Sequence, residues 1–332
     1  MNEPVILSAA KDLLLRCLCA TILAFVAVSA AAQQYPSRSV RLVVPFAPGG
    51  SADLVARLLG QRLAESWGQQ VIVDNRPGAS GMIGNEFVAK SAPDGYTLTM
   101  GTLGPFSVNQ TLFEKVPYDN IRDFAPITLT GIASHVLVAH PSAPVETVND
   151  VIALARAKPG QLMFASSGSG NATHLTFELF KAMAQVDIVH VPYKGGGPAM
   201  ADLVGGQVAF SFASMPSALP YVQAGRLRAI AVGGGQRSPL FPNVPTVAEA
   251  GLAGFESQDW QGILAPARTP VEVIARLNAE LVRILAVPEL RSKLAAAGFD
   301  AKTSTPQWFA DFIKSETAKW ARILKRSGTK VE

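Results

Sequence analysis

The chain has 332 residues, of which 48% are hydrophobic and 16% are charged, and its formal net charge is +4. This length exceeds the usual size of a single core and the composition is that of a packed globule, so we expect two domains and exclude a disordered chain. The basic residues are scattered, without a Lys/Arg stripe or an interleaved aromatic ladder, so nucleic acid is not an expected partner.

The first 32 residues have the layout of a secretory signal peptide. Lys11 and Arg16 precede an uncharged, mostly apolar run that begins at Cys17 and ends in three alanines at Ala32. A positive start, a short apolar core and an A-x-A end are typical of such peptides, and the run is shorter than the roughly 20 residues of a membrane span. We predict export with cleavage after Ala32, although the true start codon could lie further in. Cleavage removes both cysteines, which excludes disulfides, thiolate ligands and a Cys nucleophile from the mature chain.

Strand patterns alternate with helical patterns along the rest of the chain, which predicts α/β units and a largely parallel sheet. The expected strands are residues 41–46, 70–74, 96–100, 134–139, 162–165, 187–191, 208–212, 227–232 and 260–265. The expected helices are residues 51–67, 82–90, 145–157, 171–184, 198–204, 270–286, 288–297 and 306–325. The last three helices each begin at a proline, whose missing N–H has no partner in a first helical turn.

These elements form two series, each able to build its own sheet. The chain crosses between them near residue 134 and near residue 258, and no low-complexity linker separates them. We therefore predict a signal peptide over residues 1–32, a first lobe of residues 33–134 plus 259–332 and a second lobe of residues 135–258. Two short crossings suggest a hinge between the lobes. We expect the C-terminal helices to return and cover the first lobe.

A glycine-rich loop over residues 45–53 joins the first expected strand to the first expected helix. Free backbone N–H groups and the helix dipole favour an anion at such a place, although a plain strand-to-helix turn is the alternative. A carboxylate there either supports the first helical turn or meets an amino or hydroxyl group of a ligand. The candidate ligand-binding residues of this loop are Phe46, Ala47, Gly49, Gly50, Ser51 and Asp53.

A second such loop, residues 166–174, crowds small hydroxyls, an amide and free N–H groups into one turn, more donors than helix capping requires. Its candidate residues are Ser167, Gly168, Ser169, Asn171, Thr173 and His174. The helix dipole disfavours a charged His174, so we expect a neutral hydrogen-bonding or packing role for it.

Two more strand-to-helix loops carry cations. Arg76 could pair with a carboxylate bidentately, but we favour a role in bracing its own loop. Tyr193 and Lys194 could line a cleft, where Lys194 would suit a carboxylate as a point charge, although a lone lysine is usually a surface residue.

Motifs of the common enzyme classes are absent from the sequence. It contains no G-x-S-x-G elbow, no P-loop, no G-x-G-x-x-G turn and no H-E-x-x-H or similar histidine pair. We therefore expect no metal, no cofactor and no catalysis. The enzymatic alternative is a hydrolase or lyase in which Ser169 and His174 act as nucleophile and base.

Several co-linear segments resemble the Bug-type substrate-binding proteins of tripartite tricarboxylate transporters. They read PFAPGGSAD from residue 45, NRPGASG from residue 75, SGSGNATH from residue 167, VPYKGGGPA from residue 191 and WQGILAP from residue 260. The resemblance begins near residue 35 and reaches the C-terminus. It implies a type II periplasmic binding protein fold, in which two α/β lobes joined by a hinge close a cleft on the ligand.

The resemblance also implies the ligand and its site. Residues 47–51 would hold a carboxylate, partly through ordered water on their carbonyls, and residues 167–173 would contribute from the second lobe, with Thr102 and Tyr193 as neighbours. The expected ligand is a small carboxylate: a dicarboxylate, an acidic amino acid or an aromatic acid. The expected setting is a periplasmic monomer that delivers this ligand to membrane permease subunits. A sensor that presents its closed form to a signalling receptor is the alternative.

Overall fold

The computed structural model describes residues 35–327, and the compact unit discussed below begins at Ser39. The predicted signal peptide and its cleavage site after Ala32 lie outside the described residues. Over residues 35–327, no helix combines the length and the apolar character that a membrane span needs.

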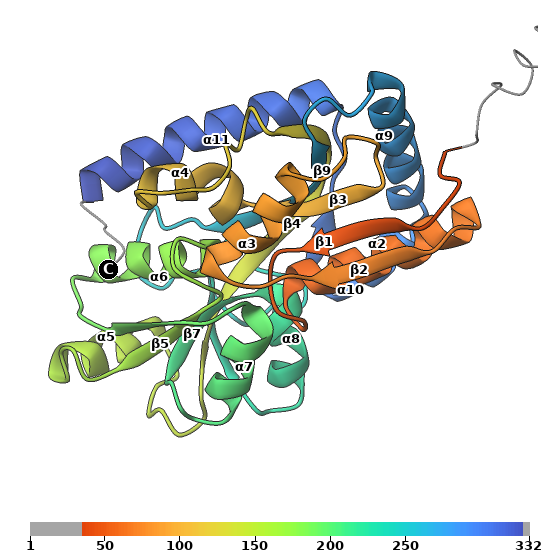
Figure 1. Ribbon diagram of the computed structural model, residues 1–332. Coiled ribbons are helices and arrows are strands. Elements are labelled where there is room, and N and C mark those ends of the chain that lie inside the picture. The colour runs from red at the N-terminus through yellow and green to blue at the C-terminus, as the bar shows by residue number, and fades with distance from the viewer. Residues whose placement is uncertain (1–34, 328–332) are drawn as a thin grey trace, which may run out of the picture. The chain divides into compact units, whose positions relative to one another are not determined.

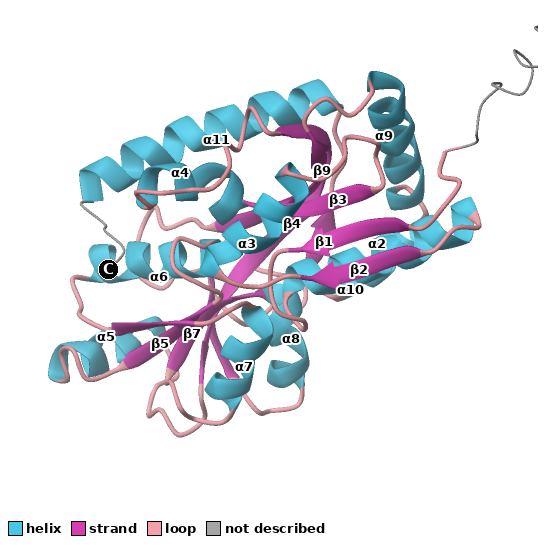
Figure 2. Ribbon diagram, viewed as in Figure 1, coloured by secondary structure: helices cyan, strands magenta, loops and turns pink. Residues whose placement is uncertain are grey.

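Within this part of the chain, ten strands form one sheet, drawn in magenta in Figure 2. The strands are β1 (Val40–Val44), β2 (Val71–Asn75), β3 (Thr97–Thr102), β4 (Phe124–Ala139), β5 (Met163–Ser166), β6 (Val189–Pro192), β7 (Phe210–Ser214), β8 (Arg228–Val232), β9 (Gln258–Pro266) and β10 (Phe299–Ala301). Their order is β2-β1-β3-β9-β4-β7-β5-β6, and β8 and β10 also pair with β4.

The long strand β4 joins two sections of this sheet. Up to Ser134 it pairs with β9, ending opposite Gln258, and from His135 it pairs with β7, starting opposite Ser214. We call β1, β2, β3, β9, β10 and residues 124–134 the first section, and β5–β8 with residues 135–139 the second section. The change of partner falls where the first crossing between lobes was predicted. The assignment of the two sections to separate lobes stays a prediction.

The prediction of a largely parallel sheet is wrong for the central strands. β1 is parallel to β2 and β3, and β5 is parallel to β6 and β7, but β4 and β9 pair antiparallel with all their neighbours. β4 is also longer than expected, because Pro126 and Gly131 interrupt its apolar pattern. The strand continues past both residues through shifts in register against β9, which the sequence pattern could not reveal.

Each predicted helix is present, with its ends shifted by at most a few residues. The helices are η1 (Ala79–Gly81), α2 (Ser51–Trp67), α3 (Met82–Ala89), η2 (Gly104–Val108), α4 (Asn109–Leu112), α5 (Val148–Ala157), α6 (Ala172–Ala184), α7 (Gly196–Val204), α8 (Met215–Gln223), α9 (Val271–Leu285), α10 (Pro288–Ala296) and α11 (Pro306–Ser327). The helix α8 was not predicted, because Pro216 and Pro220 read as helix breakers. Pro216 lies in the first turn, where proline is tolerated, and Pro220 lies inside the helix.

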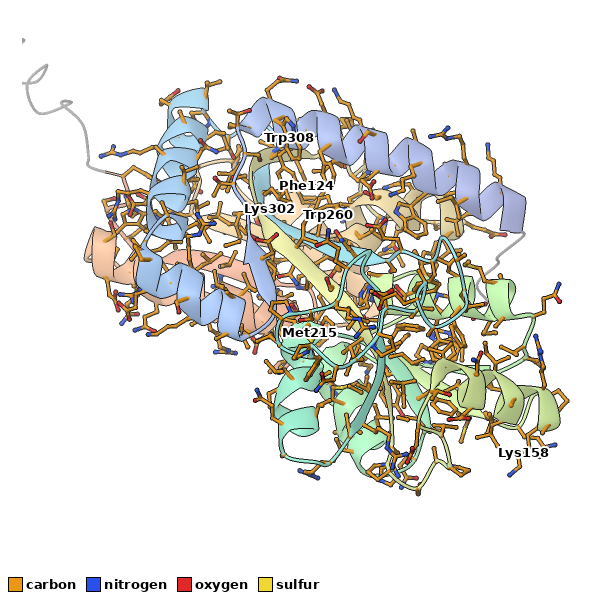
Figure 3. All side chains as sticks on the ribbon, turned by 180° about the vertical axis from the view of Figure 1, so that it is seen from behind. Phe124, Lys158, Met215, Trp260, Lys302 and Trp308 are labelled. Carbon is orange, nitrogen blue, oxygen red and sulfur yellow. The ribbon has the colours of Figure 1, made fainter. Side chains whose placement is uncertain are left out.

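The C-terminal helices cover the first section, as predicted. Figure 1 shows α11 lying along this section, while α5, α6, α7 and α8 lie beside the second. Trp260 of β9 packs edge-to-face on Phe309 of α11, with 5.6 Å between ring centroids. Figure 3 shows Trp260 and Phe124 on the side of the sheet that α11 covers. Because Trp260 turns toward α11, its neighbours Asp259 and Gln261 project to the opposite face of the strand.

Candidate functional site

A cavity of about 50 Å³ lies between the two sections. One water molecule needs roughly 10–15 Å³ of cavity volume, so this cavity has room for several waters or a small ligand. Its lining comes from the β1–α2 loop, β3 and β9 of the first section and from the starts of α6, α7 and α8 beside the second. The site is therefore made jointly by segments far apart in the sequence.

Four helices begin at this cavity: α2, α6, α7 and α8. Residues of their first turns, or the residue just before, line it, among them Ser51, Thr173, Gly196 and Ser214. The first N–H groups of a helix have no partner within the helix, and the helix dipole places roughly half a positive charge at that end. Among the described residues that line the cavity none is Lys, Arg or His. Among the described residues that line this cavity, the helix N-termini are therefore the positive groups.

Many of the predicted site residues meet in this cavity. Those that line it are Phe46, Gly50, Ser51, Asp53, Thr102, Ser167, Asn171 and Thr173. The two loops singled out in the sequence are thus brought together, although they are more than 100 residues apart.

The predicted residues Ala47 and Gly49 lie instead where the β1–α2 loop meets the β6–α7 loop. The N–H of Ala47 donates a 2.9 Å hydrogen bond to the carbonyl of Lys194. A Cβ on Gly50 would lie 3.3 Å from the backbone N of Gly196, and one on Gly197 would lie 2.0 Å from the carbonyl O of Pro48. We call this contact the glycine seam. Glycines on both sides let the two loops touch beside the cavity.

Gly168, Ser169 and Tyr193 line a second cavity, which also includes Ser80 and the exposed Lys194. The Tyr193 hydroxyl donates a 2.6 Å hydrogen bond to Asp202. Burial and the Asp202 carboxylate raise the pKa of Tyr193 to about 12. The side chain that the resemblance placed near the ligand is thus engaged with Asp202.

His174 is buried, and its Nδ1 accepts a 3.0 Å hydrogen bond from the Gly170 N–H. Its ring stacks on His190 with 4.0 Å between centroids. Burial, helped by the charge of Lys181, lowers the pKa of His174 to about 4, so the ring is neutral at pH 7. The structure thus gives the His174 ring a hydrogen bond and a stacked neighbour, and His174 lines neither of the two cavities. Its Nδ1 is occupied by Gly170, which leaves the proposed Ser169 and His174 pair without geometric support.

Asp53 is held by its own neighbourhood. Its Oδ2 accepts hydrogen bonds from the Gly49 N–H and Arg57 Nε, both at 3.1 Å. Its Oδ1 accepts from Asn75 at 3.0 Å and lies 2.9 Å from Arg57 Nη2. Burial raises the pKa of Asp53, but these hydrogen bonds and the Arg57 charge outweigh it and hold the pKa below the usual value. The carboxylate therefore braces the β1–α2 loop.

Arg76 braces its loop, as predicted. Its Nε donates a 2.8 Å hydrogen bond to Asp74, and its guanidinium lies 3.6 Å from the centroid of the Phe87 ring. Both interactions are within the first section and away from the cavity.

Asp259 and Gln261 of β9 line the cavity and were not among the predicted residues. The Asp259 carboxyl accepts hydrogen bonds from the Leu103 N–H and from Gln261, while its Oδ1 is buried without a partner. Burial raises the pKa of Asp259 to about 7, and the two hydrogen bonds offset only part of that effect. Two polar residues flanking a tryptophan in an apolar strand were the available sequence signal.

Ser214 and Ser217, at the start of α8, also line the cavity and also went unpredicted. A serine followed two residues later by proline, as at Ser214, is a helix-start signal. The helix was nevertheless not predicted, because Pro220 follows within the same segment. Over residues 35–327, no group of three or more His, Cys, Asp or Glu side chains is arranged to hold a metal ion.

Comparison with known proteins places these features in context. The sequence model of the tripartite tricarboxylate transporter family receptor (TctC) matches residues 55–329. Protein BugT of Bordetella pertussis (strain Tohama I) is 38% identical over 308 residues, which cover 92% of this chain and 94% of BugT.

Two solved structures are similar over nearly their whole length. R. palustris Rpa4515 with adipate superposes with a TM-score of 0.87 at 37% identity, covering 89% of this chain and 99% of that one. MatC (Rpa3494) from Rhodopseudomonas palustris with bound malate gives a TM-score of 0.83 at 33% identity, covering 87% and 100%.

Proposed function

Since the chain belongs to the tripartite tricarboxylate transporter receptors, as a Bug-type substrate-binding protein, we propose that it captures a small carboxylate between its two sections. Proteins of this family are periplasmic solute-binding proteins. We propose that this one is exported by cleavage after Ala32, acts as a monomer without catalysing a reaction, and delivers its ligand to the permease subunits of a tripartite transporter.

One observation carries the proposal: four helix N-termini meet at a cavity whose described lining has no cationic side chain. Free N–H groups at positive helix ends bind anions without needing a counter-ion from a side chain. A carboxylate fits this arrangement because each of its oxygens can accept two such hydrogen bonds. Adipate in Rpa4515 and malate in MatC, both dicarboxylates, support this ligand class.

We assign residues 33–134 plus 259–332 to one lobe and residues 135–258 to the other. The glycine seam, where the Ala47 N–H bonds the Lys194 carbonyl, is then the contact that forms when the lobes close. A ligand that touches both lobes stabilises the closed form by its greater affinity for it. The closed form is what the permease subunits would recognise.

The seam gives a direct test of carboxylate capture. Gly197 is the second residue of α7, where alanine favours the helix, so Gly197→Ala should fold normally. Its new Cβ, however, would lie 2.0 Å from the Pro48 carbonyl O and prevent full closure. We expect calorimetry to show malate and adipate binding to the mature protein and at least about tenfold weaker binding to the variant, equal to about 1.4 kcal/mol.

Gly235→Ala is the matched control, because a Cβ there meets only ordinary contacts with Glu256, at 3.5 Å or more, and lies outside the cavity. It should bind as the parent protein does. Neutral sugars are the control ligands. Binding of sugars but not of either dicarboxylate would overturn the proposed function, and full affinity in Gly197→Ala would overturn the closure that it assumes.

Delivery to a transporter needs its own measurement. Uptake of the bound carboxylate into vesicles that contain the permease subunits should require the added binding protein. Uptake that proceeds equally without it would contradict this part of the proposal and favour a sensory role.

A further inference from the structure

Three residues that line the cavity each have a side-chain oxygen that is buried without a hydrogen-bond partner: Asp259 Oδ1, Gln261 Oε1 and Asn171 Oδ1. Asn171 and Gln261 are 3% and 1% exposed, and Asp259 is partly exposed as a residue although its Oδ1 is buried, so bulk solvent does not satisfy these three oxygens. A buried acceptor without a donor costs about 1–3 kcal/mol. Three of them around one cavity indicate a ligand that supplies donors.

Hydrogen bonds fix which atoms of the two amides are left unpartnered. The Gln261 Nε2 donates to Ser51 Oγ at 2.8 Å, and the side chain also hydrogen-bonds Asp259. The Asn171 Nδ2 donates to the Ser167 carbonyl at 3.0 Å. Since both amide nitrogens are engaged with acceptors, the amide oxygens remain for the ligand.

Asp259 differs from Asp53, the other carboxylate at the cavity, in lacking a cation. Arg57 neutralises Asp53, whereas no Lys, Arg or His is among the described residues that line the cavity beside Asp259. A buried carboxylate without a counter-charge is costly, which is why burial raises its pKa to about 7. A cationic group on the ligand would remove that cost.

We propose that Asp259 determines ligand specificity by binding a protonated amine, with Gln261 and Asn171 accepting its remaining N–H groups. An ammonium group has three donors and no acceptor, which matches three acceptor oxygens. The ligand is then an aminated carboxylic acid, bound through its carboxylate at the helix N-termini and through its ammonium at β9. This inference rests on the proposed carboxylate function and names the ligand's second recognition element.

Matched ligands test it on the unaltered protein. Succinate, malate and aspartate differ only in carrying hydrogen, hydroxyl or ammonium at one carbon, and adipate and 2-aminoadipate form a longer pair. Calorimetry at pH 8 should give the aminated acid of at least one series a dissociation constant about tenfold or more below that of its unaminated partner. Equal or weaker binding of both aminated acids would overturn the assignment.

Asp259→Asn keeps the shape and removes the charge. We expect the preference for the aminated acid to fall to about threefold or less, while the unaminated acids bind as well as before or better, because their repulsion by the carboxylate is gone. Glu256→Gln is the control: it makes the same charge change three residues earlier, at an exposed side chain outside the cavity, and should keep the preference.

The outcomes separate the two proposals. Binding of unaminated acids with no preference for the amine, or an equal loss of all ligands in a folded Asp259→Asn protein, overturns the role of Asp259 and leaves carboxylate capture standing. If Asp259 instead donates a proton to a second ligand carboxylate, unaminated diacids should bind best and weaken above pH 7, which also overturns it. Failure of every carboxylate, aminated or not, contradicts the proposed function itself.

Discussion

Hydroxyls, an amide and helix N-termini occur on both walls of the cavity, but the wall from the first section also carries two aspartates, whereas the described residues of the second wall include no carboxylate and have neutral histidines packed behind them. Within the first wall the two carboxylates also differ: Asp53 has partners on both oxygens, and Asp259 has a buried oxygen with none. The comparison teaches that a carboxylate's partners decide its role. A carboxylate with hydrogen-bond partners on both oxygens stabilises the cavity wall, and a carboxylate with an unpartnered oxygen is available to bind the ligand.

The largest effect should separate Asp53 from Asp259. Asp53→Ala leaves the Gly49 N–H, the Asn75 amide and the Arg57 guanidinium without their acceptor, and we expect a loss of about 2–3 kcal/mol in the free energy of unfolding. Asp259→Asn in the ligand-free protein should lose nothing at pH 8. Urea unfolding of both variants measures this. If the two lost equal stability, the distinction between a bracing and a ligand-facing carboxylate would be wrong.

The second wall should respond to acid through its histidines. Burial first, then the charges of His174 and Lys181, lower the pKa of His190 to about 3, and the pKa of His174 is about 4, against about 6.5 in an unfolded chain. An unfolded chain therefore binds more protons, so the stability due to neutral rings is present above pH 6.5 and is lost as the pH falls toward 4. Because a shift of one pKa unit is worth about 1.4 kcal/mol, we expect this loss to be at least about 2 kcal/mol.

A pair of variants assigns that loss. Gln at position 190 can still accept from the Ser166 hydroxyl, which now lies 2.6 Å from His190 Nε2, but it cannot titrate. His190→Gln should lower stability at pH 7 yet flatten its decline between pH 6.5 and 4. His140→Gln, which alters a partly exposed ring away from the cavity, should leave the decline as it is. If the stability of the two variants declined equally steeply between pH 6.5 and 4, the histidines behind the second wall would not be the cause of the decline.

Local patterns predicted much of this architecture. The periodicity of residues 51–67 and the glycines before them predicted the observed limits of α2. The glycine-rich loop before α6 likewise predicted where that helix begins, to within one residue. The resemblance to the Bug-type family and the fold class that it implied are confirmed by the family match and by the superposed structures. The two helices share a cause, because each helix and the loop before it lie within about 20 consecutive residues, whereas the family resemblance rests on several segments along the chain.

The features that went unpredicted depend on partners distant in the chain. Gln261 reaches Ser51 across 210 residues, and nothing near Asp259 in the sequence reveals that its Oδ1 lacks a donor. Tyr193 lies on a predicted loop, but its hydroxyl donates a hydrogen bond to Asp202 on the adjoining helix. The way the two sections meet decides which loop residues face the first cavity and which face the second. The periodicity of the sequence contains no information about that arrangement.

The smallest effect belongs to Asp259 itself. Its pKa of about 7 in the folded chain lies above the unfolded value, so the stability due to its bound proton is complete below about pH 4 and is lost as the pH rises through 7. Asp259→Asn cannot lose that proton. The stability of this variant relative to the parent protein should therefore increase by at least about 1 kcal/mol between pH 5 and 8, measured by urea unfolding without ligand. A difference that stays constant with pH would show that the carboxyl is ionised throughout and meets a donor in the empty cavity. Repeating the measurement with an excess of the preferred aminated acid should reverse the sign at pH 8, because the ammonium then stabilises the charged carboxylate that the variant lacks.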